Sequence, residues 1–540
     1  MMKEVKKKLL NKESNVLGLY NAKPNEIENP LGKVTIGASI FSFIQISVFL
    51  SWFYWVYKKY MIWFEHEELT RTSTLLPNTS IVKVGIPLFI LSIILEYLIG
   101  LLSTTDYNSK EQYRLSDTIA SFSNGIIQQL IEMWTTLIGD MFGLVMITAI
   151  PYKFIYENYG VTRIFEGNWQ GFLFMFLARD FCYYWFHRAA HRCAFMWAVH
   201  GVHHQPNSFS YHVNLSQGGI QRITSTVFYA PLALFCPPEL YTIIFPMEKI
   251  YGFFTHTCLV GRSHWLVSLF FVTPSSHRVH HAGAPTKYID KNYGEMLSIW
   301  DKLFGTHQEE EEAIVFGHCQ PIDSYEPIYS QFNGWLKIWK KSKLVKSPWK
   351  KFLCFIMPPG WDPIIGKEFD LSSSNLKNST PYNSEKYDSQ LPNNLLKFYL
   401  LIWFIQTLAL SIYLIKMNTQ FIKPNGGGGG GGYYFLEIII LFCYIIYSLF
   451  CFGSISDLNS NSIYYDSIRL LLTPLIFYSI FNQKLSKSIF VYISIICLIS
   501  FLILFSNKNY FKFEKSIEKQ KRIWIKEIGR DYTNKLNKIK

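Results

Sequence analysis

Long apolar runs separated by polar stretches dominate the pattern along this chain. The first four runs cover about residues 34–57, 82–102, 126–150 and 172–186, and four more cover about 396–415, 434–452, 468–481 and 489–505. A helix needs about 20 apolar residues to cross the hydrocarbon core of a bilayer, and most of these runs approach or exceed that length. The pattern therefore predicts an all-α, multi-pass integral membrane protein.

Proline interrupts one further apolar segment, residues 223–255. The segment contains Pro231, Pro237, Pro238 and Pro246. Proline in a helix interior removes a backbone hydrogen bond and clashes with the preceding turn. We therefore expect a bent hairpin that enters the bilayer and returns to the same side.

The polar segments divide the chain into expected domains. A basic cytosolic tail, residues 1–33, precedes a membrane-embedded catalytic domain, residues 34–310. Residues 311–394 form a cytosolic polar segment and linker, which includes a lysine-rich stretch with tryptophans that suits a membrane surface. Residues 395–506 supply C-terminal transmembrane helices joined in part by a flexible glycine run, and residues 507–540 form a second basic cytosolic tail.

The charged residues indicate that the chain binds a membrane and how it is oriented across that membrane. Only 17% of the residues are charged, against about a quarter in soluble proteins, yet the net charge is +13. The lysines cluster beside apolar runs, so attraction to an anionic membrane face explains the excess better than nucleic-acid binding does, and we expect no nucleic-acid partner. Placing the basic segments in the cytosol puts both termini and the clustered histidines there as well.

Three short runs hold eight of the 14 histidines. These eight are His187, His191, His200, His203, His204, His277, His280 and His281. Residues at i, i+3 and i+4 share one face of a helix, so each run should present its imidazoles together. Eight imidazoles exceed the needs of one metal ion, and the pattern favours two ions held close together. Imidazole suits iron, zinc, copper and nickel, so residue type leaves the choice of metal open.

Two residues outside these runs are further candidates for the site. Asp180 precedes His187 by seven residues, so on a helix it lies on the same face and could accept a hydrogen bond from the N–H of a metal-bound imidazole, as such carboxylates do. A role at a helix start or an interface fits its spacing equally well. His256 ends an apolar stretch and is a candidate ninth ligand, whereas we expect His307 and His318 at the surface.

The residue types in these runs limit the reactions that the site could catalyse. A zinc hydrolase would show a carboxylate base in a His-Glu-x-x-His pattern, which the sequence lacks. Two redox metals at a membrane can instead activate O2 against an unactivated C–H bond, with a lipid substrate entering from the bilayer. A non-enzymatic alternative is a metal transporter with a histidine relay, although such a relay would place its ligands in the middle of spans.

The sequence around the histidines resembles the fatty acid hydroxylase / sterol desaturase superfamily. The resemblance rests on the order of the three histidine runs and on residues 180–188 (DFCYYWFHR) and 274–281 (PSSHRVHH). Residues 114–121 (RLSDTIAS), 288–293 (YIDKNY) and 300–305 (WDKLFG) are most similar to the alkylglycerol monooxygenases within it. The similarity extends over roughly residues 35–310.

This resemblance implies a non-haem enzyme with two iron ions per chain in the endoplasmic reticulum membrane. It implies that tetrahydrobiopterin and O2 hydroxylate the O-alkyl carbon of a glyceryl ether, and that the hemiacetal collapses to a fatty aldehyde and a glycerol derivative. The alternative within the superfamily is a sterol desaturase, sterol methyl oxidase or other lipid hydroxylase that takes electrons from cytochrome b5. Two positions depart from the expected pattern: Arg192 stands where related monooxygenases carry an acid, and Ser276 where a histidine is frequent.

Overall fold

The computed structural model describes most of the chain between residues 79 and 512. The described residues are 79–102, 113–142, 150–162, 168–312, 314–319, 322–368, 387, 391–421, 431–481 and 486–512, with scattered positions between 43 and 58. Most of the two basic tails, of the first expected span and of the glycine run lie outside these residues.

Ten helices make up the histidine-bearing part of the described residues. They are α3 (Thr79–Leu102), α5 (Leu115–Phe142), α6 (Ile150–Tyr159), α7 (Trp169–Arg192), α8 (Ala194–His200), α9 (Gln221–Tyr229), α10 (Pro238–Thr255), α11 (Trp265–Phe270), α12 (Pro274–His280) and α13 (Ile299–Leu303). The 3-10 turns η3 (Tyr211–Leu215), η4 (Ala230–Leu234) and η5 (Thr286–Tyr288) connect some of them. Two short antiparallel strands, β1 (Ala282–Ala284) and β2 (Val315–Phe316), are a small departure from the expected all-α fold.

Local sequence signals set the ends of the two helices that matter most for the site. Asn168 caps α7 by accepting a hydrogen bond from the Gly171 N–H at 2.7 Å, as asparagine does at N-caps. Thr273 begins α12 with a reciprocal capping arrangement with Ser276, and Pro274 occupies the first turn, where its missing N–H costs nothing. Both histidine-bearing helices are therefore fixed at the end where they start.

The structure corrects the predicted boundaries of several spans. The run expected at 126–150 belongs to α5, which starts earlier, at Leu115, and ends at Phe142. The short run at 172–186 continues through the first histidine cluster, so span and cluster form one helix, α7. In the expected hairpin the chain bends around Pro231 and Pro237, whereas Pro246 lies inside α10 without ending it.

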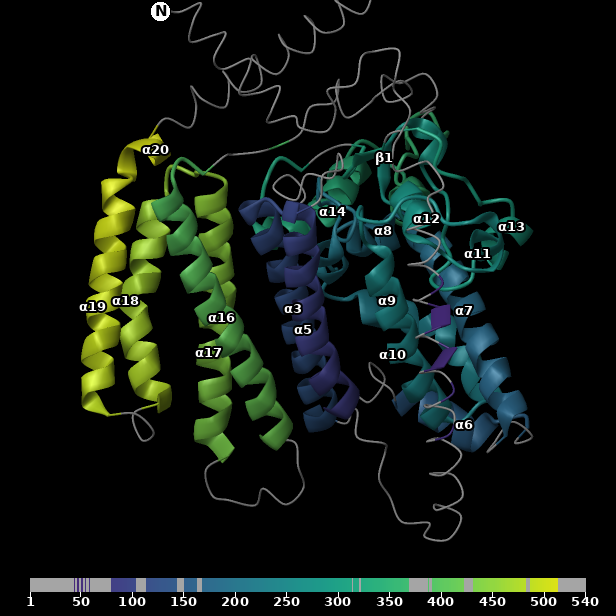
Figure 1. Ribbon diagram of the computed structural model, residues 1–540, viewed down its shortest axis with the longest axis horizontal. Helices are drawn as coiled ribbons and strands as arrows, with labels where there is room; N and C mark the ends of the chain where they lie inside the picture. Colours follow the sequence, from purple (N-terminus) through teal and green to yellow (C-terminus); the bar gives the residue numbers. More distant parts are fainter. Residues whose placement is uncertain are drawn as a thin grey trace, which may run out of the picture.

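The C-terminal part is a bundle of long apolar helices beside the histidine-bearing part. It consists of α16 (Asn394–Phe421), α17 (Gly431–Ser456), α18 (Ser462–Phe481) and α19 (Lys487–Ser506), followed by α20 (Lys508–Lys512). Figure 1 shows α3 and α5 between this bundle and the histidine-bearing helices, and α5 shares a hydrophobic core with the bundle. Within the described residues, three helices are long and apolar enough to cross a membrane: Asn394–Met417, Phe435–Ser456 and Lys487–Ser506.

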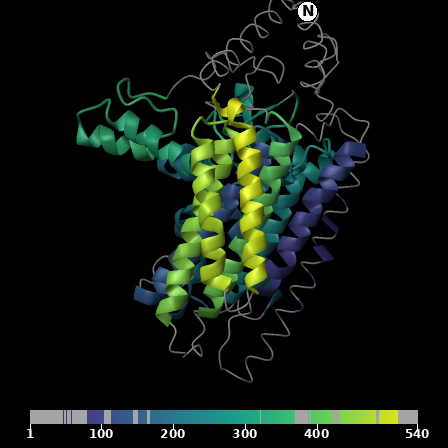
Figure 2. The ribbon, with the colours of Figure 1, turned by 90° about the vertical axis from the view of Figure 1, so that its left-hand side faces the viewer.

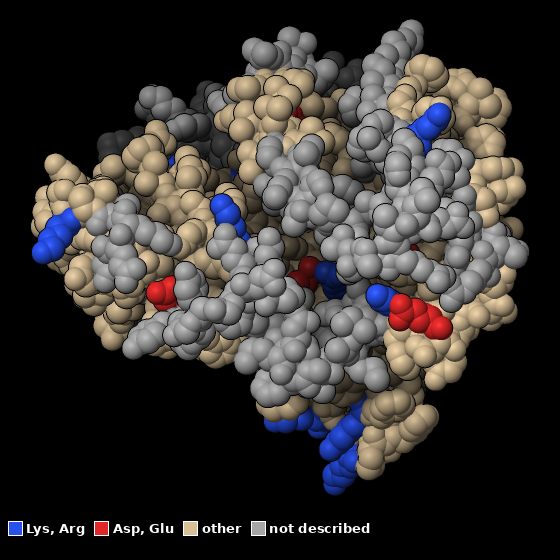
Figure 3. All heavy atoms as spheres, turned by 90° about the horizontal axis from the view of Figure 1, so that it is seen from below, with Lys and Arg blue, Asp and Glu red and all other residues tan. Residues whose placement is uncertain are grey.

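An arm projects sideways from the end of the molecule that carries the histidines. It is formed by α14 (Pro327–Ser342) and α15 (Pro348–Ile356), and Figure 2 shows it roughly perpendicular to the long helices. Its exposed side chains combine aromatic rings, such as Trp339 and Trp349, with several lysines. Lys and Arg gather at a projecting edge in Figure 3, while the described remainder of that face carries few charges. This composition fits the expected position at a membrane surface.

We predict that this arm and both tails face the cytosol. Tags placed in residues 1–33, in the turn between α14 and α15, and after residue 512 should all be cleaved by protease added to sealed microsomes, because basic segments stay on the cytosolic side. A tag in the loop between α16 and α17 serves as the protected control. Protection of one cytosolic tag together with cleavage of another would contradict the even number of crossings.

Candidate metal centre

Nine buried histidines converge into two adjacent groups. The first group consists of His187, His191, His200, His204 and His280, and the second of His203, His256, His277 and His281. Within each group, one ring nitrogen per residue lies within 4.8 Å of the corresponding nitrogens of the others. The structure thus brings together all eight clustered histidines and the ninth candidate, His256.

The two groups arise from the spacing within each histidine run. Residues four apart fall in the same group, as His187 and His191 do on α7 and His277 and His281 do on and just after α12. On a helix, positions i+3 and i+4 point about 100° apart, and His280 accordingly enters the other group. The second run departs from the predicted helix, because α8 ends at His200 and the next residues form turns.

The nitrogen atoms of these histidines form a donor set that suits metal ions. The Nε2 atoms of His187 and His200 lie 3.0 Å apart, and those of His256 and His277 also lie 3.0 Å apart. Two nitrogen atoms that each lie about 2.1 Å from the same metal ion are themselves roughly 3 Å apart, which matches these separations. The Nε2 atoms of His191, His280 and His281 are buried without a hydrogen-bond partner, which is costly unless another group binds them. The residues present therefore fit two metal ions.

Burial also keeps the imidazoles in the form that binds metal. Removal from water lowers the pKa of His203 to about 4 and lowers the pKa values of His204 and His281 well below the usual value. Burial disfavours the charged imidazolium. These side chains are therefore neutral at pH 7, and a metal need not displace protons from them.

Backbone carbonyl oxygens orient several of the histidine rings by accepting hydrogen bonds from their Nδ1 atoms. The Nδ1 atoms of His187, His203 and His256 lie 2.8, 3.0 and 2.7 Å from the carbonyl oxygens of Tyr293, Ser216 and Gly252. A carbonyl can only accept, so Nδ1 carries the proton and Nε2 is left to face the neighbouring histidines. His280 is held in the same way by the Lys291 carbonyl at 2.9 Å.

Asp180 does not make the predicted contact with a histidine. Its carboxylate accepts from the backbone N–H groups of Met296 and Leu297, at 3.1 and 3.3 Å, and from Trp300 Nε1 at 2.8 Å. Seven residues along a helix correspond to about 10 Å, so Asp180 lies too far down α7 to reach His187. It instead fixes the loop that carries Tyr293, whose carbonyl accepts from His187.

Sequence reasoning missed a buried ion pair next to the clustered histidines. Arg278, between two histidines of the third run, is fully buried, and its Nη2 atom lies 2.6 Å from Glu310 Oε2. Its Nη1 atom also donates to the carbonyls of Thr257 and Val260, at 2.9 and 2.6 Å. The charge of Arg278 within a histidine run was a signal that a counter-charge lies nearby. The partner is 32 positions further along the chain, however, and no spacing rule identifies such a partner. His318 was also misjudged: it is half-buried and its Nε2 donates to the Gly201 carbonyl at 2.6 Å.

Arg192 binds two carboxylates, those of Asp290 and Glu368. Its Nη1 atom lies 2.7 Å from Asp290 Oδ2, and its Nη2 atom lies 2.7 Å from Glu368 Oε2. Asp290 also lies 3.5 Å from His191 Nδ1. Arg192 therefore links the end of α7 to the loop that follows α12, at a half-exposed position.

We expect Arg192→Glu to lower stability modestly and to leave substrate choice unchanged. Three acids would then face one another, but the site is partly exposed, so the loss should be about 1 kcal/mol or less. Since the guanidinium already binds two carboxylates, the KM values for phosphorylated and neutral lipid substrates should change by the same factor. Arg192→Lys is the control that keeps the charge. A selective rise in KM for the phosphorylated lipid would instead assign Arg192 to head-group binding.

Comparisons with known proteins agree with the site. The fatty acid hydroxylase family matches residues 172–306, the segment that contains all nine histidines. The chain is 31% identical to human alkylglycerol monooxygenase over 75% of this chain and 84% of that protein, and 30% identical to the zebrafish (Danio rerio) enzyme over 72% and 80%. A Δ7-sterol 5(6)-desaturase of Aspergillus fumigatus matches more distantly, at 24% identity over 25% of this chain and 36% of the desaturase. No solved structure matches the chain.

Proposed function

This chain belongs to the alkylglycerol monooxygenase family within the fatty acid hydroxylases, and from that premise we propose that it is a di-iron enzyme that cleaves glyceryl ether lipids. The observation that carries the proposal is the pair of buried histidine groups at one end of a membrane protein. We propose that the five histidines of the first group hold one iron and the four of the second hold the other. Bound iron would supply the activation of O2 that hydroxylates the O-alkyl carbon.

The proposed overall reaction balances with one pterin per turnover. One oxygen atom of O2 enters the C–H bond next to the ether oxygen, and the other leaves as water with two hydrogens that tetrahydrobiopterin loses. The resulting hemiacetal breaks its C–O bond to give a fatty aldehyde and a glycerol hydroxyl. We place this chemistry in the endoplasmic reticulum membrane, as the family resemblance implies. We place both termini in the cytosol, because the charge pattern favours that orientation.

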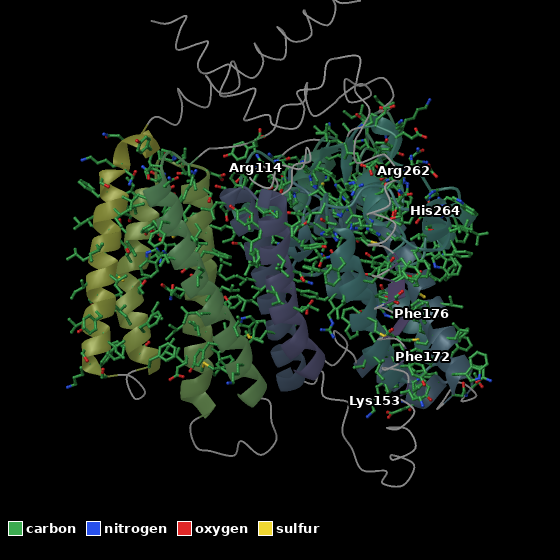
Figure 4. The ribbon with its side chains drawn as sticks, in the orientation of Figure 1. Arg114, Lys153, Phe172, Phe176, Arg262 and His264 are labelled. Carbon is green, nitrogen blue, oxygen red and sulfur yellow. The ribbon has the colours of Figure 1, made fainter. Side chains whose placement is uncertain are left out.

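The chain's own residues position the site and exclude water from it. The carbonyls of Tyr293, Ser216 and Gly252 orient three imidazoles through their Nδ1 atoms. Below the histidines, α7 contributes an apolar core that includes Phe172, Met175 and Phe176, two of which Figure 4 labels on the lower part of that helix. This packed core keeps water away from that side of the histidines.

The position of the histidines also argues against the metal transporter. A relay needs ligands spaced along a path through the membrane, whereas these nine meet in two adjacent groups at one end. The ligand geometry alone does not separate an ether-lipid monooxygenase from a sterol desaturase or another lipid hydroxylase. The electron donor does separate these activities, because the monooxygenase would use a pterin and the alternatives would use cytochrome b5.

An assay on membranes containing the full chain tests the proposal. A 1-O-alkylglycerol is supplied with tetrahydrobiopterin or, in a parallel reaction, with reduced cytochrome b5, and the fatty aldehyde is measured. We expect aldehyde only with the pterin and only in the presence of O2. Sterol oxidation supported by cytochrome b5, without aldehyde from the ether lipid, would assign the chain to the alternative activity.

A further inference from the structure

Each helix of the arm, α14 and α15, exposes one apolar face. Positions three or four apart share a face of a helix, and the large exposed apolar side chains of both helices follow that spacing. They are Tyr329, Phe332, Leu336 and Trp339 on α14, and Trp349, Phe352 and Ile356 on α15. Large apolar faces that the rest of a protein leaves uncovered commonly mark an interaction surface.

The charge of the arm has a single sign. Residues 327–361 contain seven lysines and no acidic residue. Five of these lysines are exposed, namely Lys337, Lys340, Lys343, Lys346 and Lys351. Figure 3 shows Lys and Arg on the projecting edge in a view from below, that is, from the side toward which the long helices extend. A surface of aromatic rings and lysines is complementary to an anionic lipid leaflet.

The orientation of the arm selects lipid over a protein partner. Figure 2 shows it roughly perpendicular to the long helices, and the segments long and apolar enough to cross a membrane belong to those helices. The arm therefore runs along the bilayer plane, where an amphipathic helix buries its apolar face about 5–10 Å into the headgroup boundary. Interfaces between proteins are depleted in lysine, so a second copy of the chain fits this surface less well.

The inner face of the arm packs against α8, the helix that ends at His200. A Cβ atom on Gly334 of α14 would come within 2.5 Å of the Ala198 Cα atom, so the two helices touch backbone to backbone. Just after α15, the Met357 carbonyl accepts from the Ala194 N–H at 3.0 Å. Both helices of the arm are thus fixed to the segment that leads into the second histidine run.

The arm also holds the chain that follows this run. Gln331 of α14 accepts from the Gly219 N–H at 2.8 Å and donates to the Gln217 carbonyl at 3.0 Å. Gln205, which directly follows His204, donates to the Ser330 carbonyl at 3.1 Å. Contacts on both sides of the second histidine run therefore connect it to the arm.

We propose that the arm binds anionic phospholipids of the leaflet along which it lies, and that this contact holds α8 and the second histidine run in place. The proposal goes beyond the proposed function, because it depends neither on the substrate nor on the electron donor. It makes the charge of the membrane surface a condition for order at one side of the metal centre. Each lysine close to an anionic surface typically strengthens binding about fivefold.

Hydrogen exchange of the full chain in nanodiscs measures both the lipid contact and its effect on α8. Discs of phosphatidylcholine are compared with discs in which phosphatidylserine replaces part of that lipid. We expect the amides of α14, α15 and α8 to exchange at least about fivefold more slowly in the anionic discs, the effect of a single lysine. At about 1 M salt, where the Debye length is about 3 Å, the difference should disappear.

Two triple variants separate charge from structure. Lys340→Glu, Lys343→Glu and Lys346→Glu together reverse exposed charges, so the exchange of the arm should no longer depend on the lipid. Lys340→Arg, Lys343→Arg and Lys346→Arg are the matched control, which keeps the charges and should respond as wild type does. All three side chains are exposed, so both variants should fold.

Each other outcome overturns a stated part of the proposal. Equal exchange of the wild-type arm in the two kinds of disc would mean that it does not select anionic lipid. Protection that rises with protein concentration in detergent would assign the surface to a second copy of the chain. A response of α14 and α15 without any response of α8 would refute the link to the second histidine run.

Discussion

Replacing His191 or His281 with alanine is expected to abolish turnover and to lower the iron content. Each is a buried member of a different histidine group, and each has an Nε2 atom without a hydrogen-bond partner. Loss of a residue that merely supports a ligand typically costs 10–100-fold, so loss of a ligand should cost at least about 100-fold. The wild type should hold about two iron ions per chain by elemental analysis, and each variant about one or fewer.

His264→Ala is the matched control for these variants. His264 is exposed, begins α11 by accepting from the Leu266 N–H at 3.3 Å, and belongs to neither group. It should keep two iron ions and full activity. One zinc ion and no iron in the wild type, or full activity in both His191→Ala and His281→Ala, would refute the di-iron assignment.

The convergence of the histidines was predictable because it depends on local helix geometry. Spacings of three and four residues bring imidazoles together whatever the rest of the chain does, and all eight clustered histidines do meet. Their division into two groups was not predicted, because it depends on how α7, α8, α10 and α12 approach one another. Asp180 shows the same limit: its spacing gave its face of α7 but not its partners, which lie more than 100 positions away.

The apolar runs likewise predicted which segments are helical better than they predicted where each helix begins and ends. The C-terminal helices appear where expected, because a long apolar run is a composition signal, and three of these four helices are long and apolar enough to cross a membrane. The boundaries of α5 and α7 differ, since both helices continue into polar sequence that other parts of the protein bury. The small polar cavity lined by Ala120, Gln205, Tyr325 and Tyr387 could not be predicted at all, because these residues are far apart in the sequence and meet only in the folded chain.

The second large effect is expected at the buried pair of Arg278 and Glu310. Arg278 lies on α12 between His277 and His280, and through Thr257 and Glu310 it ties that helix to the segments that flank the site. Glu310→Ala would leave a guanidinium buried without its counter-charge, which typically costs 3–5 kcal/mol. We expect a large drop in thermal stability together with loss of iron, because α12 contributes to both histidine groups.

The neighbouring residue provides the control, since burial is the variable that should decide the effect. Glu311 pairs with Lys287 at 3.0 Å, but its side chain is 56% exposed, whereas that of Glu310 is 1% exposed. Water screens the exposed pair, so Glu311→Ala should cost no more than about 1 kcal/mol and should retain its iron. Thermal unfolding and elemental analysis of the two purified variants make the comparison. Equal stability and equal iron content would mean that the Arg278 charge does not depend on Glu310, and that other contacts hold α12 against the metal centre.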